Sequence, residues 1–135
     1  MANVLYDPGR EGFLDGTIIW SSGNIKVSLV RGYTFSAAHK FVSDVTGAGG
    51  TLVATSANLS SKTVTNGIAD AADFTYTAVG AGSSCAALVG YQDTGVAGTS
   101  RLIFFIDSAT GLPVTPNGGD ISVAWDNGTN KIFKL

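Results

Sequence analysis

The amino-acid sequence predicts an all-β fold, a single-domain β-sandwich or barrel that spans residues 1–135 and carries one or two short helices. Three observations support this prediction. Apolar residues recur at every second position in most of the apolar segments, as in strands. Clusters of Gly, Asn, Ser and Asp separate these segments at short spacing, which is typical of sandwiches and barrels. The length is that of one domain, which buries enough surface to fold without a disulfide or a metal ion.

Six segments are expected to form strands. Within Ile25–Val30, apolar and polar residues alternate, which indicates a half-buried strand. Leu102–Ile106 is apolar without alternation, so we expect a central strand that is covered on both faces. The six segments are Thr17–Trp20, Ile25–Val30, Phe74–Val79, Leu88–Tyr91, Leu102–Ile106 and Ile121–Trp125.

Two hairpins are predicted from Asn-Gly pairs, because Asn and Gly adopt the positive φ angles of a tight turn. The first joins Ile121–Trp125 to Lys131–Leu135 through the loop 126–130. The second joins Ser61–Val64 to Ile68 through Thr65-Asn66-Gly67.

Two short helices are expected. The first has Asp7 as its cap and Pro8 at its first position, which is favoured for proline, although Gly9 and Gly12 weaken this helix. Ser36–Val45 places its apolar residues on one helical face and begins with Ser36 as the N-cap. A strand is the alternative for this second segment.

Composition narrows the classes of function. The net charge is −2 and the eight basic residues are scattered, so no nucleic-acid partner is expected. Residues Met1–Asp7 lack a basic segment followed by an apolar one, and Leu102–Ile106 is the longest strongly apolar run. We therefore expect no secretory leader, no membrane span and synthesis in a cytoplasm. The single cysteine, Cys85, lies in an apolar run and is expected to be a buried, inert thiol.

The low proportion of charged residues, 13%, leaves two interpretations open. Soluble proteins average about a quarter. A surface that packs against neighbours in an assembly explains the difference, because the cores of interfaces are depleted in charge. A soluble β-protein with Thr and Ser at its exposed positions explains it as well.

Asp93-Thr94-Gly95 is the one motif with a catalytic counterpart. The same tripeptide carries the catalytic aspartate of retroviral-type aspartic proteases, in which two carboxylates share one proton. Here Gln92 stands where those proteases have an apolar residue, and their second motif is missing. A turn between two strands is the preferred interpretation.

Other polar clusters give no site. His39 is the only histidine, with Ser36 and Asp44 near it in sequence, but no glycine-framed nucleophile turn is present. Asp70 and Asp73 lack the spacing of a calcium loop, and one His with one Cys does not make a zinc site. We expect no catalytic residue, metal or cofactor, and therefore no enzyme.

Several segments resemble a family of small virion proteins of tailed bacteriophages. The similar segments are Leu5–Gly16 followed by Ile18 and Trp20, His39–Asp44, Ser100–Ile103, and Gly111–Ile121 followed by Trp125. The resemblance implies a structural protein of the virion, most simply a capsid cement or decoration protein. Such a protein binds the outside of the shell formed by the major capsid protein, and homotrimers are a common arrangement.

Two other functions stay open. One is a tail or adsorption-apparatus protein of the virion. The other is a carbohydrate-binding β-sandwich, for which Trp20, Tyr33 or Trp125 would have to be exposed so that a sugar ring can stack on it.

Contacts with the shell or with sister subunits are expected from the two ends of the chain. The N-terminal segment Asn3–Leu14 holds large apolar side chains, and Tyr and Arg are enriched at interface hot spots. The alternative is that this segment folds back on its own core. The expected interface residues are Tyr6, Arg10, Phe13, Leu14, Phe133 and Leu135.

Overall fold

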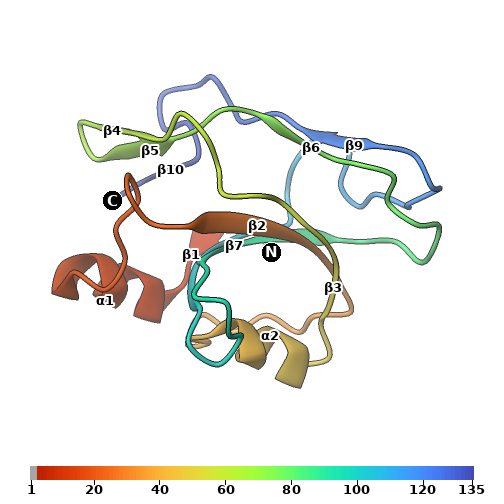
Figure 1. Cartoon of the computed structure of the whole chain (residues 1–135), viewed down its shortest axis with the longest axis horizontal. Coiled ribbons are helices and arrows are strands. Elements are labelled where there is room, and N and C mark those ends of the chain that lie inside the picture. Colours follow the sequence, from red (N-terminus) through yellow and green to blue (C-terminus); the bar gives the residue numbers. More distant parts are fainter. Residues whose placement is uncertain (1–2) are drawn as a thin grey trace.

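The structure is a computed structural model and describes residues 3–135, which form short strands and two short helices. Figure 1 shows three layers: a small upper layer of strands, a central sheet, and two helices below it. In chain order the elements are β1 Val4–Leu5, α1 Asp7–Asp15, β2 Ile25–Arg31, α2 Val42–Gly47, β3 Thr51–Thr55, β4 Thr63–Thr65, β5 Ile68–Asp70, β6 Phe74–Tyr76, β7 Ala87–Gln92, β8 Arg101–Ile106, β9 Ile121–Val123 and β10 Phe133–Lys134.

The central sheet has five antiparallel strands in the order β1-β8-β7-β2-β3. The predicted strands at Leu88–Tyr91 and Leu102–Ile106 are confirmed as β7 and β8. β8 lies between β1 and β7 and is buried on both faces, as its apolar sequence predicts.

The strand predicted at Ile25–Val30 is confirmed as β2, but it is not half-buried. Ile25 and Leu29 point into the core above the sheet. Ser28 points the other way and is also buried, where its hydroxyl lies 2.8 Å from that of Thr55 and 3.3 Å from that of Tyr91. Hydrogen bonding allows a serine to occupy a buried position, and its presence made the face look solvent-exposed in the sequence.

The upper layer consists of two small antiparallel sheets, ordered β10-β5-β4 and β6-β9. The predicted segments Phe74–Val79 and Ile121–Trp125 form β6 and β9, each shorter than expected. The predicted hairpin at Thr65-Asn66-Gly67 is confirmed, since β4 pairs with β5 and both Asn66 and Gly67 have positive φ angles.

The predicted C-terminal hairpin is wrong. β9 pairs with β6 and β10 pairs with β5, so the two segments follow one another along the same edge. Between Val123 and Phe133 the chain bulges out as a loop before it resumes pairing. Two hydrogen bonds hold the ends of the loop. At its start, the Trp125 backbone N–H donates to Asp73 Oδ1 at 2.8 Å. At its end, the Ile132 N–H donates to the Ala69 carbonyl oxygen at 3.1 Å.

Helix α1 begins at Asp7 with Pro8 in its first turn, so the predicted N-terminal helix is confirmed, but its N-cap is Tyr6 and not Asp7. The helix lies directly on β8: a Cβ atom on Gly9 would come within 2.6 Å of the Leu102 carbonyl oxygen. The buried Arg101 side chain donates from β8 to the Pro8 carbonyl oxygen. The glycine that weakens this helix in isolation is therefore what lets it approach the sheet.

The second helix begins later than predicted. Residues 36–41 precede it, and α2 covers only Val42–Gly47. Asp44 explains this start, because its Oδ2 accepts the N–H groups of Lys40 and Phe41 at 2.8 and 2.9 Å. Val42 and Val45 are buried, as the predicted apolar face requires.

The strand predicted at Thr17–Trp20 is absent; these residues lie in a turn region after α1. Ile18 and Trp20 are buried and Ile19 is exposed, so the burial alternates without strand pairing. The Trp20 indole N–H donates to the Asp70 carbonyl oxygen at 3.1 Å. The alternation in the sequence reflects side chains that cover the end of the core.

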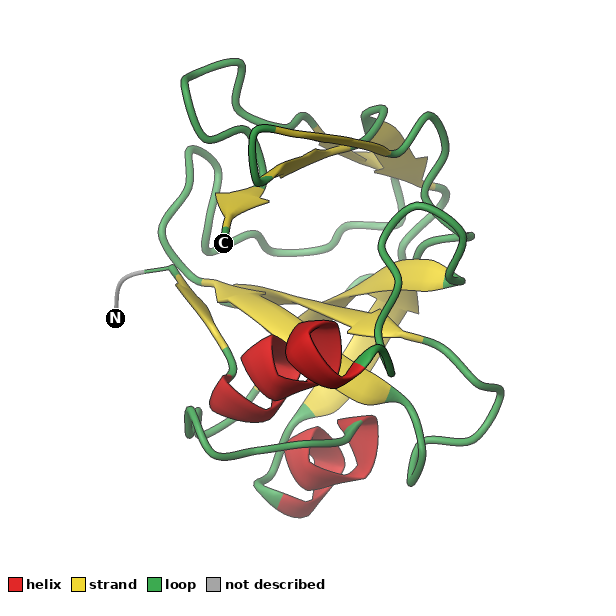
Figure 2. Ribbon diagram, turned by 90° about the vertical axis from the view of Figure 1, so that its left-hand side faces the viewer, coloured by secondary structure: helices red, strands yellow, loops and turns green. Residues whose placement is uncertain are grey.

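Figure 2 shows the central sheet between the upper strands and the two helices. The larger cluster of buried apolar residues lies between the central sheet and the upper layer, and the smaller one lies between the central sheet and the helices. Cys85 is fully buried, as predicted, and burial raises the pKa of its thiol. The all-β, sandwich-like prediction with two short helices is confirmed.

Candidate functional site

An apolar groove opens where the end of α1, the following turn and the upper layer meet. We call it the α1–β10 groove. Its volume is about 340 Å³, and none of its lining side chains is charged. The apolar side chains that line it are Phe13, Ile18, Ile19, Trp20, Val64, Phe133 and Leu135. Three of the six residues predicted for the interface, Phe13, Phe133 and Leu135, therefore lie together around one depression.

Packed aromatic rings form the floor of the α1–β10 groove. The ring centroid of Phe133 lies 5.8 Å from that of Phe13 and 5.3 Å from that of Trp20, the latter edge-on. The hydrogen bond from the Leu135 N–H to the Gly67 carbonyl, 3.0 Å long, holds the C-terminal strand against the β4–β5 hairpin. The floor is thus fixed by contacts within the chain.

The rim of the groove is apolar and open to solvent. Ile19, Val64 and Leu135 are 51%, 59% and 59% exposed. Leu14, beside Phe13 on α1, does not line the groove but is 88% exposed. Arg10 precedes Leu14 by four residues and is exposed on the same side of the helix.

Tyr6 was predicted to lie at the interface, but it is not at the surface. Its side chain is fully buried beneath the central sheet, and its hydroxyl lies 3.1 Å from that of Tyr33. Burial and this hydrogen bond raise the pKa of the Tyr6 hydroxyl. Val4 and Leu5 pair with β8 in the same region. The first part of Asn3–Leu14 therefore folds onto its own core, and of the interface residues predicted in this segment Arg10, Phe13 and Leu14 reach the surface.

Sequence reasoning missed Ile19 and Val64. Ile19 belongs to a segment predicted as a strand, and nothing in that segment marked it as an interface residue. Val64 alternates with Thr63 and Thr65 in a short strand, all three of which are exposed. An apolar residue on a strand with no buried face is the signal that could have identified Val64.

The carboxyl group of Asp93 is engaged in a turn. Its Oδ1 accepts the Gly95 N–H at 3.0 Å, and its Oδ2 lies 2.9 Å from Lys26 Nζ. The hydrogen bond from Lys26, followed by that from Gly95, holds the pKa of the Asp93 carboxyl below its usual value. Gly95 has a φ of 88°, which suits a turn.

The neighbours of His39 do not form a catalytic triad. Its Nδ1 lies 2.6 Å from the Tyr33 hydroxyl. Ser36 Oγ accepts the Ala38 N–H, and the Asp44 carboxylate accepts the backbone N–H groups that start α2. The serine and the aspartate of this set thus have hydrogen bonds within the local backbone.

Both tryptophans of the carbohydrate-binding alternative are buried. Trp20 is covered by Phe133, and Trp125 packs edge-on against Phe104. Tyr33 is partly buried between aromatic neighbours. Because sugar stacking needs an exposed ring face, this arrangement counts against that alternative.

The described part of the chain holds neither a cluster of metal ligands nor a helix that could span a membrane. Within residues 3–135, no three His, Cys, Asp or Glu side chains converge as metal ligands. Neither helix in that range has the length and apolar character needed to cross a bilayer.

Comparison with known proteins adds no family. The sequence matches no protein-family model and no curated protein.

Proposed function

We propose that the protein is a capsid cement protein, which binds the outer surface of the major capsid shell of a tailed phage and stabilises that shell. The phage setting rests on the sequence resemblance. The observation that carries the binding function is the α1–β10 groove, an uncharged apolar depression with exposed apolar side chains on its rim. Contiguous apolar surface of this kind typically marks an interaction site.

The energetics favour a protein partner. Covering one large apolar side chain contributes about 1.5–3 kcal/mol. Association also costs translational and rotational freedom, so several side chains must be covered together. Ile19, Val64 and Leu135 line one groove, with Leu14 next to it, and all four can be covered by one complementary surface.

A cement protein acts by mass action. Because it binds the assembled shell and not the dissociated capsid proteins, it shifts the equilibrium towards the shell. Its own requirements are a rigid fold and a preformed contact surface. The aromatic floor of the groove supplies such a surface, since Phe13, Trp20 and Phe133 are already packed in the free chain.

The proposal includes a homo-oligomer, with a trimer expected because homotrimers are a common arrangement among cement proteins. Identical copies around a three-fold axis place identical grooves towards the shell. Sedimentation velocity of the purified protein measures this directly. If the purified protein is a monomer and still binds shells, the proposed trimer is wrong and the proposed cement function stands.

Binding to shells that lack the protein tests the proposal. The double variant Ile19→Thr, Val64→Thr removes apolar surface from the rim without touching the aromatic floor. Cosedimentation should show at least about tenfold weaker binding than for the wild type, equivalent to about 1.4 kcal/mol. Val96→Thr is the matched control, because Val96 is 61% exposed but lies outside the groove.

Two results would overturn the proposal. Wild-type protein that does not bind shells removes the cement function, and binding to tails instead supports the tail alternative. Equal binding by the double variant and the control would show that the groove is not the contact surface.

A further inference from the structure

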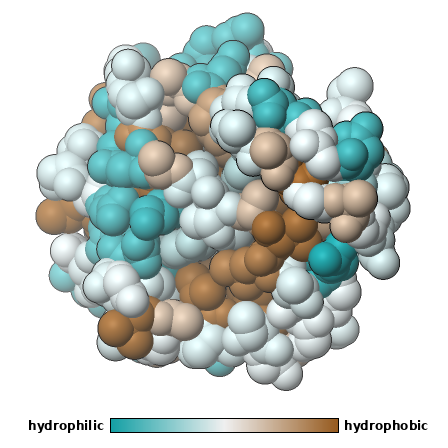
Figure 3. Space-filling model, turned by 45° about the vertical axis from the view of Figure 1, so that its right-hand side comes forward, coloured by the Kyte–Doolittle hydropathy of each residue, from teal (hydrophilic) through white to brown (hydrophobic). Residues whose placement is uncertain are grey.

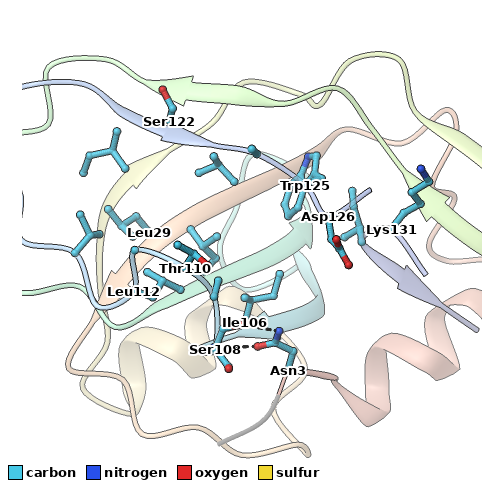
Figure 4. Close-up of a pocket in the computed structure, with 18 residues that line it drawn as sticks. Asn3, Leu29, Ile106, Ser108, Thr110, Leu112, Ser122, Trp125, Asp126 and Lys131 are labelled. Atoms are coloured by element: carbon cyan, nitrogen blue, oxygen red, sulfur yellow. Dashed lines mark hydrogen bonds between the residues drawn. The ribbon is translucent and has the colours of Figure 1, made fainter. Parts of the chain in front are cut away.

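A second cleft lies between the central sheet and the upper layer. We call it the interlayer cleft; its volume is about 760 Å³. Figure 4 shows that its lining side chains come from β2, the loop after β8, and the segment that includes β9. Apolar side chains reach the surface in a hollow on one face of the molecule (Figure 3). The volume is in the range of ligand sites, about 300–1,000 Å³.

The cleft exists because the two layers differ in width. The central sheet has five strands, whereas each of the sheets above it has three or fewer. Leu29, Leu88 and Ile106, from three neighbouring strands of the central sheet, all line the cleft. Leu29 and Leu88 are buried and Ile106 is partly exposed, so these three side chains form the floor of the cleft beneath the edge strand β9.

The lining residues show that the cleft runs along the edge of β9. Successive side chains of a strand point to opposite faces, so a cleft on one face would contact every second residue. All three residues of β9 and the two that follow it, Ala124 and Trp125, line the interlayer cleft. A continuous run of this kind is expected when the cleft lies beside the backbone of the strand.

Hydrogen bonding on the other side of β9 indicates which groups face the cleft. The Gly119 carbonyl accepts the Val79 N–H at 2.9 Å, and the Trp125 N–H donates to Asp73 Oδ1 at 2.8 Å. Both contacts are made towards the β6 side. Because backbone groups alternate in direction along a strand, Ser122 and Ala124 present their N–H and C=O groups to the open edge.

The charge of the cleft limits its occupant. Its only charged lining residues are Asp126 and Lys131, one of each sign. The floor is aliphatic, and the remaining polar residues carry hydroxyl or amide groups. An occupant that carries a net charge in its centre gains no counter-charge there, whereas a neutral chain with apolar side chains fits.

We propose that the interlayer cleft binds an extended, uncharged segment of a partner protein, which pairs with the open edge of β9. The segment completes the upper layer: its backbone bonds to Ser122 and Ala124, and every second side chain is apolar and lies on the floor formed by Leu29, Leu88 and Ile106. Strand addition of this kind combines main-chain hydrogen bonds with side-chain pockets. This inference does not depend on the phage assignment or on the α1–β10 groove.

Hydrogen exchange of the full chain, with and without a peptide, tests the inference. The probe is a soluble heptapeptide in which valine and threonine alternate between terminal lysines. The amides of Ser122 and Ala124 should exchange rapidly in the free protein and about tenfold more slowly at saturating peptide. The amides of Ile121 and Val123 should change little, because they face β6.

Three variants sharpen the test. Ser122→Pro removes one edge N–H and should abolish binding, whereas Ser122→Ala keeps the N–H and should bind as the wild type does. Ala109→Trp places a ring in the cleft from the exposed loop on the opposite wall and should also abolish binding. This variant leaves β9 unaltered, so it keeps the test decisive if Ser122→Pro unfolds.

Several outcomes would overturn the inference: no binding at millimolar peptide, binding without protection of Ser122 and Ala124, or equal binding by Ala109→Trp. Dodecanoate that enters the cleft when the peptide does not would assign the site to small apolar molecules instead.

Discussion

Replacing Gly9 by alanine should destabilise the protein, although the same replacement usually stabilises a helix. Alanine is favoured over glycine inside a helix by about 0.5–1 kcal/mol. At Gly9 the new Cβ would lie 2.6 Å from the Leu102 carbonyl oxygen and 3.1 Å from that of Ile103. Both atoms belong to the backbone of β8, the second strand in the order of the central sheet, and cannot rotate away.

The steric cost should exceed the gain in helix propensity. Overpacking in a well-packed region costs about 1–3 kcal/mol, so we expect a net loss of about 1–2 kcal/mol in the free energy of unfolding. For a chain of this size, that loss lowers the melting temperature by about 3–10 °C. Urea denaturation and calorimetry measure both quantities.

Gly47→Ala is the matched control. Gly47 is the exposed last residue of α2, and a Cβ there meets no atom within 4 Å. This variant should be as stable as the wild type or more stable, by up to about 1 kcal/mol. If Gly9→Ala proved equally stabilising, α1 would not be in contact with β8 as described.

Three further predictions concern stability. Gly90→Ala should cost about 1–3 kcal/mol, because the new Cβ would lie 2.2 Å from the Phe104 ring; denaturant titration measures the loss. Asp44→Ala should cost about 1–2 kcal/mol because the start of α2 loses two hydrogen bonds, whereas Asp44→Asn, which keeps an acceptor, should lose less. The hydrogen bonds that lower the pKa values of the Asp93 and Asp44 carboxyl groups stabilise the folded state above the unfolded-state pKa of about 4. This stabilisation is lost as the pH falls through the lower pKa values of the folded state. Melting curves from pH 7 to pH 2 should therefore fall below pH 4, and less steeply for Asp93→Asn; an equal fall in the variant would contradict the assigned contact with Lys26.

Two of the three Asn-Gly pairs in the sequence, those predicted to form hairpins, show how far local turn chemistry predicts the fold. Asn66-Gly67 forms the expected hairpin, because its flanking strands pair with each other. Asn127-Gly128 lies in a loop, because β9 and β10 each have another partner, β6 and β5. The choice between these partners depends on contacts with residues more than fifty positions away, such as that between Asp73 and Trp125. Turn residues alone do not encode it.

Central strands were easier to predict than the helices. The apolar run of β8 indicates burial on both faces whatever its neighbours are. For α1, the sequence suggests a weak helix, and the reason for Gly9 emerges only from the contact with β8. For α2, the cap comes from Asp44 inside the helix and not from the expected Ser36.

The candidate site could be predicted only in part, because some of its residues come together only through contacts between distant segments. Phe13, Phe133 and Leu135 could be named as large apolar residues near the chain ends. Ile19 and Val64 gain their role only where the turn after α1 meets the β4–β5 hairpin. Tyr6 was misassigned because an aromatic residue in a weakly structured segment looks the same in sequence whether it is buried or exposed.

Cryo-microscopy of the assembled particle can locate the protein and its contact surface in one experiment. A map that resolves the protein should show it on the outside of the capsid shell, with Ile19, Val64 and Leu135 in contact with the major capsid protein or a sister subunit. Density for the protein on the tail, or on the shell with the α1–β10 groove open to solvent, would contradict the account.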